Sequence, residues 1–172
     1  GTKTTIGLSH NGESIDDSIT ISTPQNQRKV GEMLHYEVRK LIGHLNVDAI
    51  AICAPAPIDK RRGLILAPHN IPWRNLRICA PLQKVFNCPV VIEHDATAGG
   101  IAEARFGAGR KYNLFCYVTI STGVGGVIMY NNSPLPRPHN AEFGAQIVEG
   151  EHIGMSTLSG SFEHLASGRA IE

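Results

Sequence analysis

One aspartate stands where a catalytic base could act. Asp95 follows the apolar run 89–92 and opens a stretch of small residues, 96–106, which is typical of a helix that packs closely on another element. A carboxylate at the end of a strand can accept a proton from a reacting hydroxyl, as a general base does. Asp is equally a preferred residue for capping the start of a helix. The residues alone leave both interpretations open.

A glycine-rich segment, 121–126, could hold phosphate groups. It lies between the apolar runs 114–120 and 127–130, which predicts a turn between two strands. Glycines leave backbone N–H groups open to an anion, and Thr122 adds a hydroxyl. Taken alone, glycines that serve steric needs in a hairpin are the more common case, and the spacing matches neither a P-loop nor a Rossmann fingerprint. A phosphate cradle beside an aspartate base, however, is what phosphoryl transfer to a hydroxyl requires.

Composition and charge exclude several other classes of function. The chain has 172 residues, 42% of them apolar, and 16 basic against 15 acidic residues give a formal charge of +1. This near neutrality provides no basic footprint for nucleic acid or an anionic membrane, so a small ligand is the expected partner. No apolar run approaches the ~20 residues of a membrane helix. The four cysteines show no C-x-x-C spacing, which predicts reduced, mostly buried thiols in a cytoplasmic protein.

The elements that would position these residues alternate between strand and helix, which predicts an α/β fold. Strands are expected at 4–9 and 18–22, joined by a turn at Asn11-Gly12, and at 47–53, 63–66 and 89–92. Helices are expected at 23–43, 81–86 and 96–106. The glycine break at 107–109 is the best boundary between two lobes, which would span 1–109 and 110–172.

Seven short segments, in this order and spacing, resemble the ROK family, named for repressors, open reading frames and kinases. They are GTK (1–3), APAPID (54–59), APHNIPW (67–73), EHDATA (93–98), ISTGVGG (120–126), AEFG (141–144) and FEHLASG (162–168). Each segment is weak by itself, whereas their order along the whole chain is specific. The resemblance implies a two-lobed, actin-like ATPase (ribonuclease H-like) fold in a sugar kinase. Such a kinase transfers the γ-phosphoryl group of Mg-ATP to a hexose or an N-acetylated amino sugar, and Asp95 would be its general base.

The resemblance also implies which residues bind the two substrates. On the sugar side, beside Asp95, they are Asn70, His94, Glu142 and Glu163. At the phosphates and magnesium they are Gly1, Thr2, Lys3, Thr122, Gly123, Gly125 and Gly126. Taken singly, the sugar-side residues other than Asp95 would be ordinary solvated side chains. The partners implied are a small-molecule sugar, ATP with Mg²⁺ and, since family members often form homodimers, a second copy of the chain.

The chain departs from the family pattern at three places. His94 stands where the family usually has Asn, which exchanges an amide for an imidazole that titrates near neutrality. Ala145 stands where a histidine is usual, and no cysteine lies between Ala145 and Glu163, where the family usually has C-x-C-G-x-x-G-C. A tetrahedral zinc site needs such ligands, so no structural zinc is expected.

The two ends and the departures leave two alternatives beside the kinase. The chain begins at what would be the second glycine of the family's Asp-x-Gly-Gly-Thr-Lys segment, and it stops before the helices that would hold adenosine. We therefore expect an internal piece of a longer protein, with exposed apolar edges and a tendency to associate. One alternative is a non-catalytic sugar-sensing protein, such as the effector domain of a repressor. The other is a degenerate relative that binds a partner. Retention of Asp95, Glu142 and Glu163 favours the kinase.

Overall fold

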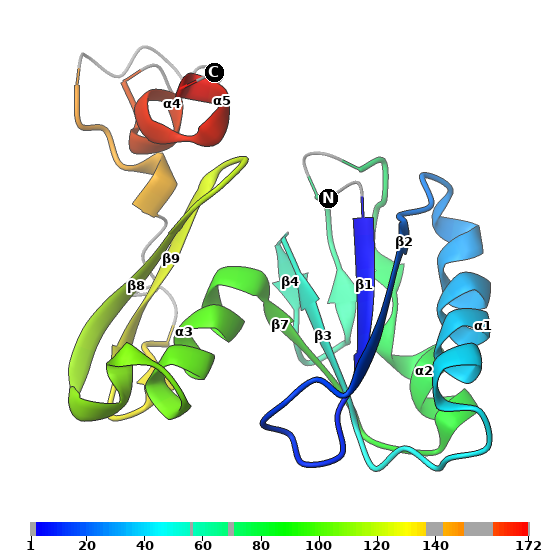
Figure 1. Ribbon diagram of the computed structural model, residues 1–172. Helices are drawn as coiled ribbons and strands as arrows, with labels where there is room; N and C mark the ends of the chain where they lie inside the picture. Colours follow the sequence, from blue (N-terminus) through cyan, green and yellow to red (C-terminus); the bar gives the residue numbers. More distant parts are fainter. Residues whose placement is uncertain (1–2, 56, 69–70, 137–142, 150–159, 172) are drawn as a thin grey trace. The chain divides into compact units, whose positions relative to one another are not determined.

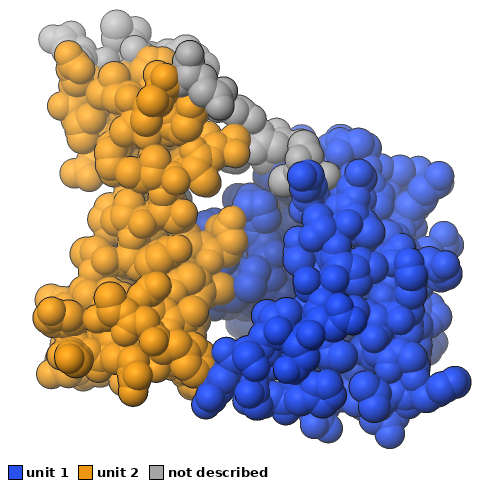
Figure 2. All heavy atoms as spheres, viewed as in Figure 1, with its two compact units in different colours: residues 1–94 blue, residues 95–172 orange. Residues whose placement is uncertain are grey.

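The chain forms two compact units that divide between His94 and Asp95 (Figure 1, Figure 2). The computed structural model describes residues 3–55, 57–68, 71–136, 143–149 and 160–171. The units combine strands and helices, as the mixed α/β prediction requires. Each unit is described by itself below.

The first unit begins with an antiparallel hairpin of β1 (Lys3–Leu8) and β2 (Asp17–Ser22). Both strands were expected, but the connection is the longer loop 9–16 in place of a two-residue turn at Asn11 and Gly12. The reason is local hydrogen bonding. Asn11 Oδ1 accepts from the backbone N–H groups of Glu13 and Ser14 at 2.8 and 3.0 Å, so the chain curls around the asparagine before the second strand begins.

The same loop is closed by Asp16, whose Oδ2 lies 2.9 Å from His10 Nδ1 and accepts from the His10 backbone N–H at 2.7 Å. The side-chain hydrogen bond first, and then the backbone one, lower the pKa of Asp16. A lowered carboxyl pKa contributes stability above its unfolded value, and that contribution is lost as the pH falls through the folded value. We predict that His10→Ala raises the pKa of Asp16 part of the way toward the value of an ordinary aspartate. Titration of the Asp16 carboxyl carbon by ¹³C NMR measures this change. His44→Ala, at an exposed position of the same unit, is the control, and equal midpoints in the two variants would contradict the prediction.

A parallel pair of strands and two helices form the next part of the first unit (Figure 1). The pair is β3 (Ile50–Ala54) and β7 (Val90–His94), and the helices are α1 (Val30–Ile42), which follows the short helix η1 (Gln27–Lys29), and α2 (Cys79–Phe86). Their apolar faces share one core that includes Val30, Leu82 and Ile92. Because the strands are parallel, their carboxyl ends, Ala54 and His94, lie side by side.

A small antiparallel sheet completes the unit, with β5 (Leu64–Ile65) between β4 (Ile58–Asp59) and β6 (Leu76–Arg77). Trp73, just before β6, is 7% exposed, and its Nε1 donates to the Pro24 carbonyl at 3.0 Å. The tryptophan of the segment 67–73 is therefore a core residue whose polar atom has a hydrogen-bond partner.

The second unit is built on a hairpin of β8 (Leu114–Ile120) and β9 (Val124–Tyr130), with β10 (Ser133–Pro134) beside β9. Helix α3 (Asp95–Arg105) packs on one face of this hairpin, over the fully buried Val127 and Met129. The remaining short helices are η2 (Ala108–Lys111), η3 (Phe143–Ala145), α4 (Phe162–Ala166) and α5 (Gly168–Ile171). In Figure 1, α4 and α5 lie near the turn between β8 and β9.

The boundary between the units differs from the predicted lobes 1–109 and 110–172. Helix α3 packs on β8 and β9, so the helix and the glycine break that follows it both belong to the second unit. Close packing is the reason, because Gly99 and Gly100 have no Cβ and leave room for the side chains of Tyr117 and Val127.

Two sequence-based expectations about single features can be compared with the structure. Only Cys79 and Cys88 are buried, so the prediction of mostly buried thiols is wrong for Cys53 and Cys116, which are exposed in β3 and β8. Burial raises the pKa of the Cys79 thiol. In the part of the chain that the structure describes, no helix has the length and apolar character needed to cross a membrane.

Candidate functional site

Asp95 is the first residue of α3, directly after β7. Its side chain is exposed, and its Oδ1 accepts from the Ala96 backbone N–H at 2.7 Å. A negative charge in the first turn is also favoured by the helix dipole. Asp95 therefore lies in the first turn of α3 and bonds to the next residue, and its side chain has the exposure that a general base needs.

The turn between β8 and β9 is shorter than the glycine-rich segment. It comprises Ser121, Thr122 and Gly123, and it is closed by a hydrogen bond from the Ser121 N–H to the Gly123 carbonyl at 2.8 Å. Strand β9 already begins at Val124, which pairs with Ile120. Gly125 and Gly126, predicted as part of a phosphate cradle, are therefore residues of the ladder. Thr122 is exposed in the turn, as a phosphate contact requires.

Each glycine of this segment has a close neighbour that a side chain would displace. A Cβ on Gly123 would lie 2.6 Å from Glu163 Oε2, and one on Gly125 would lie 3.2 Å from the Ala96 Cβ. A Cβ on Gly126 would overlap the Phe143 ring. Packing thus explains these glycines without any phosphate. It also brings the start of α3, beside Asp95, against the first residues of β9.

Glu163 of α4 reaches the same turn. Its Oε2 accepts from the Val124 backbone N–H at 2.9 Å, across 39 residues of sequence. The backbone adds a second link, because the Gly168 N–H donates to the Ser121 carbonyl at 2.7 Å. The segment that contains α4 and α5 therefore holds the turn at two points.

The predicted site residues fall into three groups: those in the second unit, those in the first unit, and those outside the described residues. The second unit collects, around one turn, Asp95, Thr122, Gly123, Gly125, Gly126 and Glu163. Two others lie in the first unit: Lys3 is exposed at the start of β1, and His94 ends β7, where its N–H donates to the Glu93 carboxylate at 2.9 Å. The remaining four, Gly1, Thr2, Asn70 and Glu142, lie outside the described residues.

Residues that sequence reasoning did not single out support the turn. A Cβ on Gly144 would overlap the Val124 carbonyl oxygen, and Phe143 fills the space above Gly126. Gly168 supplies the backbone link to Ser121. The sequence signal for Gly144 and Gly168 is that each lies in one of the segments 141–144 and 162–168, whose glutamates are the predicted site residues.

A cluster of metal ligands is absent from the part of the chain that the structure describes. No three His, Cys, Asp or Glu side chains gather there as a metal ion would need. Ala145, which replaces the usual histidine, is exposed and offers no donor atom. The segment 150–159, in which the family usually has its cysteines, lies outside the described residues.

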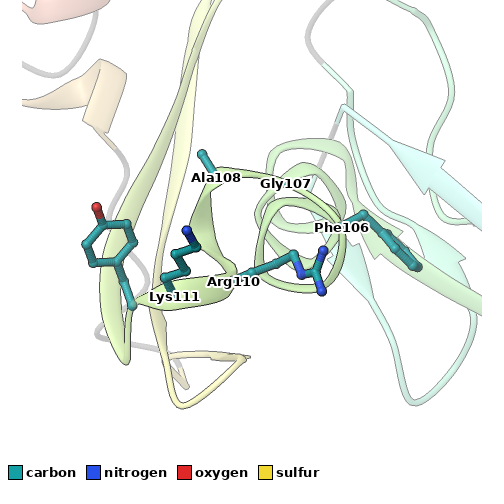
Figure 3. A pocket seen from close by; sticks show the side chains of 6 residues that line it. Phe106, Gly107, Ala108, Arg110 and Lys111 are labelled. Carbon is teal, nitrogen blue, oxygen red and sulfur yellow. The ribbon is translucent and has the colours of Figure 1, made fainter.

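An open pocket of about 490 Å³ lies elsewhere in the second unit, in the segment between α3 and β8 (Figure 3). Its lining residues are Phe106, Gly107, Ala108, Arg110, Lys111 and Tyr112. None of them is a predicted site residue, so the pocket is separate from the turn that Glu163 contacts.

The whole chain, residues 1–172, matches the model of the ROK family. The chain belongs to the ROK family. Glucokinase from Streptomyces coelicolor is 29% identical to this ROK protein over 177 residues, which cover 99% of this chain and 55% of the glucokinase. The xylose repressor of Bacillus spizizenii is 35% identical over 102 residues, 59% of this chain and 26% of the repressor.

A solved structure of a ROK family glucokinase from Streptomyces griseus, in complex with glucose and AMPPNP, matches 99% of this ROK protein. The TM-score is 0.79, the sequence identity is 29%, and the match covers 55% of that glucokinase chain. The mixed α/β fold therefore matches ROK kinase structures over part of their length. The chain spans about half the length of these glucokinases, and its relatives include both sugar kinases and repressors.

Proposed function

We propose that this ROK protein is an ATP-dependent sugar kinase of the cytoplasm, with the two-lobed, actin-like ATPase (ribonuclease H-like) fold. The acceptor would be a hexose or an N-acetylated amino sugar. One observation carries the proposal: the start of α3, with Asp95, packs against the first residues of β9, where Ala96 meets Gly125. That contact supports the proposal, because the Asp95 carboxylate belongs to the same unit as the turn that would face the phosphates.

In this proposal each residue has a separate task. Asp95 accepts the proton of the attacking sugar hydroxyl, while its position at the helix start fixes its backbone. Asn70, His94, Glu142 and Glu163 bind the sugar's other hydroxyls, since amide, imidazole and carboxylate groups all pair with hydroxyls. Mg-ATP, when bound, supplies the γ-phosphoryl group. The residues that would hold its phosphates are Gly1, Thr2, Lys3, Thr122 and Gly123.

The turn fits phosphate groups only in part. Thr122 is exposed, and Gly123 has no side chain to exclude an oxygen. The Ser121 and Val124 N–H groups, however, already donate within the protein, to the Gly123 carbonyl and to Glu163. These two amides become available to a phosphate only when their hydrogen bonds open.

A second candidate function is sugar sensing without catalysis. The observation that favours it is the 35% identity to the xylose repressor of Bacillus spizizenii. That match covers 59% of this chain, whereas the match to the Streptomyces coelicolor glucokinase covers 99%. The match to this glucokinase therefore covers more of the chain than the match to this repressor does.

The deciding experiment is calorimetric titration of the full-length protein with glucose, N-acetylglucosamine, N-acetylmannosamine, mannose, fructose and xylose. Any sugar that binds is then tested for ADP release in the presence of Mg-ATP. The kinase proposal expects sugar-dependent ADP release. Sugar binding without turnover would support the sensor, and no binding to any sugar would overturn both.

A further inference from the structure

Glu163 occupies the turn that the proposed function gives to phosphate groups. Its Oε2 accepts the Val124 N–H at 2.9 Å and lies 3.2 Å from the position of a Cβ on Gly144. Gly123 and Gly144, both without side chains, leave the space that the carboxylate fills. The glycines at these two positions are thus fitted to an anionic group of the protein itself.

The helix that carries Glu163 is firmly anchored. Ser161, which is 1% exposed, forms a β-bridge with Ile147, and its hydroxyl caps α4 by accepting the His164 N–H at 3.1 Å. The Phe162 N–H donates to the Gln146 carbonyl at 2.8 Å. Glu163 itself is an exposed residue. Because its backbone is held and its side chain reaches solvent, the carboxylate can leave Val124 without unfolding α4.

A carboxylate and a phosphate compete for the same donor. The Val124 N–H has one proton to donate, and two anions at one turn repel each other. We propose that Glu163 is a positioning residue that gates the turn: its carboxylate holds the Val124 amide, and phosphate groups bind the turn only after the carboxylate withdraws.

The gate would link the two substrates. This step rests on the proposed function, which assigns the same Glu163 carboxylate to sugar hydroxyls. A sugar that engages the carboxylate draws it away from Val124 and frees the turn. Sugar binding therefore raises the affinity for nucleotide, and by linkage nucleotide raises the affinity for sugar by the same factor.

The first test measures the Kd of Mg-AMPPNP by calorimetry on the full-length protein, with and without glucose. Glu163→Gln keeps a carbonyl oxygen for the Val124 N–H but removes the charge. We expect its Kd without glucose to be about tenfold lower than in the wild type, because a charge-assisted hydrogen bond is replaced by a weaker neutral one and the repulsion is gone. Adding glucose should lower the Kd of Mg-AMPPNP by about tenfold in the wild type, but by less than about twofold in Glu163→Gln. Glu149→Gln, an exposed glutamate of the same unit, should behave as the wild type.

The second test follows hydrogen exchange of the Val124 amide by NMR and needs no ligand. Glu163→Ala should speed this exchange about tenfold, whereas Glu149→Ala should leave it unchanged. The gate is wrong if Glu163→Gln has an unchanged or higher Kd for AMPPNP, or if Glu163→Ala leaves the Val124 exchange rate unchanged. In either case, sugar-dependent ADP release would still support the kinase. If the wild type and all variants fail to bind AMPPNP, the kinase proposal and the gate proposal are both wrong. The exchange rates then show only whether Glu163 holds the turn.

Discussion

Asp95→Asn is expected to lower kcat for sugar phosphorylation by about 10²–10⁴-fold, the range that a positioned general base contributes. The amide cannot take the proton of the sugar hydroxyl, but its carbonyl oxygen can still accept the Ala96 N–H that Asp95 accepts at 2.7 Å. The start of α3 should therefore be preserved. Sugar affinity should change by no more than a few fold, because the base acts mainly in the transition state. Steady-state kinetics with calorimetric sugar titration measures both quantities.

A matched control for Asp95→Asn is Asp48→Asn, which makes the same change at an exposed position in the loop before β3. It should leave kcat unchanged. If Asp95→Asn retained wild-type turnover, Asp95 would serve the helix start alone and the proposed mechanism would be wrong. If the variant lost sugar binding and helix content together, the effect would be structural, and the circular dichroism spectrum would show it.

Gly100→Ala is expected to destabilise the protein by about 2 kcal/mol, although alanine is the better helix former. Gly100 lies within α3, and a Cβ there would overlap the Val127 side chain and lie 3.3 Å from the Met129 sulfur. Val127 and Met129 are both 0% exposed, so neither has free space to move into. The overlap outweighs the gain of up to about 1 kcal/mol in helix propensity. Thermal unfolding followed by circular dichroism measures the loss.

The control for Gly100→Ala makes the same exchange in the other long helix. Gly31 lies in α1, and a Cβ there would meet no atom within 4 Å. Gly31→Ala should therefore raise stability by roughly 0.5–1 kcal/mol through helix propensity and the smaller freedom of the unfolded chain. Equal effects of the two variants would show that α3 does not pack on β8 and β9 as closely as the structure describes.

The strands and helices around Asp95 were predictable from sequence because local patterns determine them. The apolar run 89–92 appears as β7, and the small residues after Asp95 form α3, which ends at Arg105. Short-range chemistry also explains the main error in the first unit. Asn11 bonds to Glu13 and Ser14, so a pattern typical of a two-residue turn became part of a longer loop.

The sequence by itself determined the family, through the order of seven short segments, and it led to the prediction that Asp95 and the glycine-rich turn act together. Only the tertiary structure decided where that turn ends and what holds it. Val124 pairs with Ile120 and donates to Glu163, which is 39 residues away, so Gly125 and Gly126 belong to a strand and a glutamate occupies the turn. Local patterns carry backbone preferences and periodicity. They do not determine how distant segments pack, and here residues from distant segments fill the space beside each of these glycines.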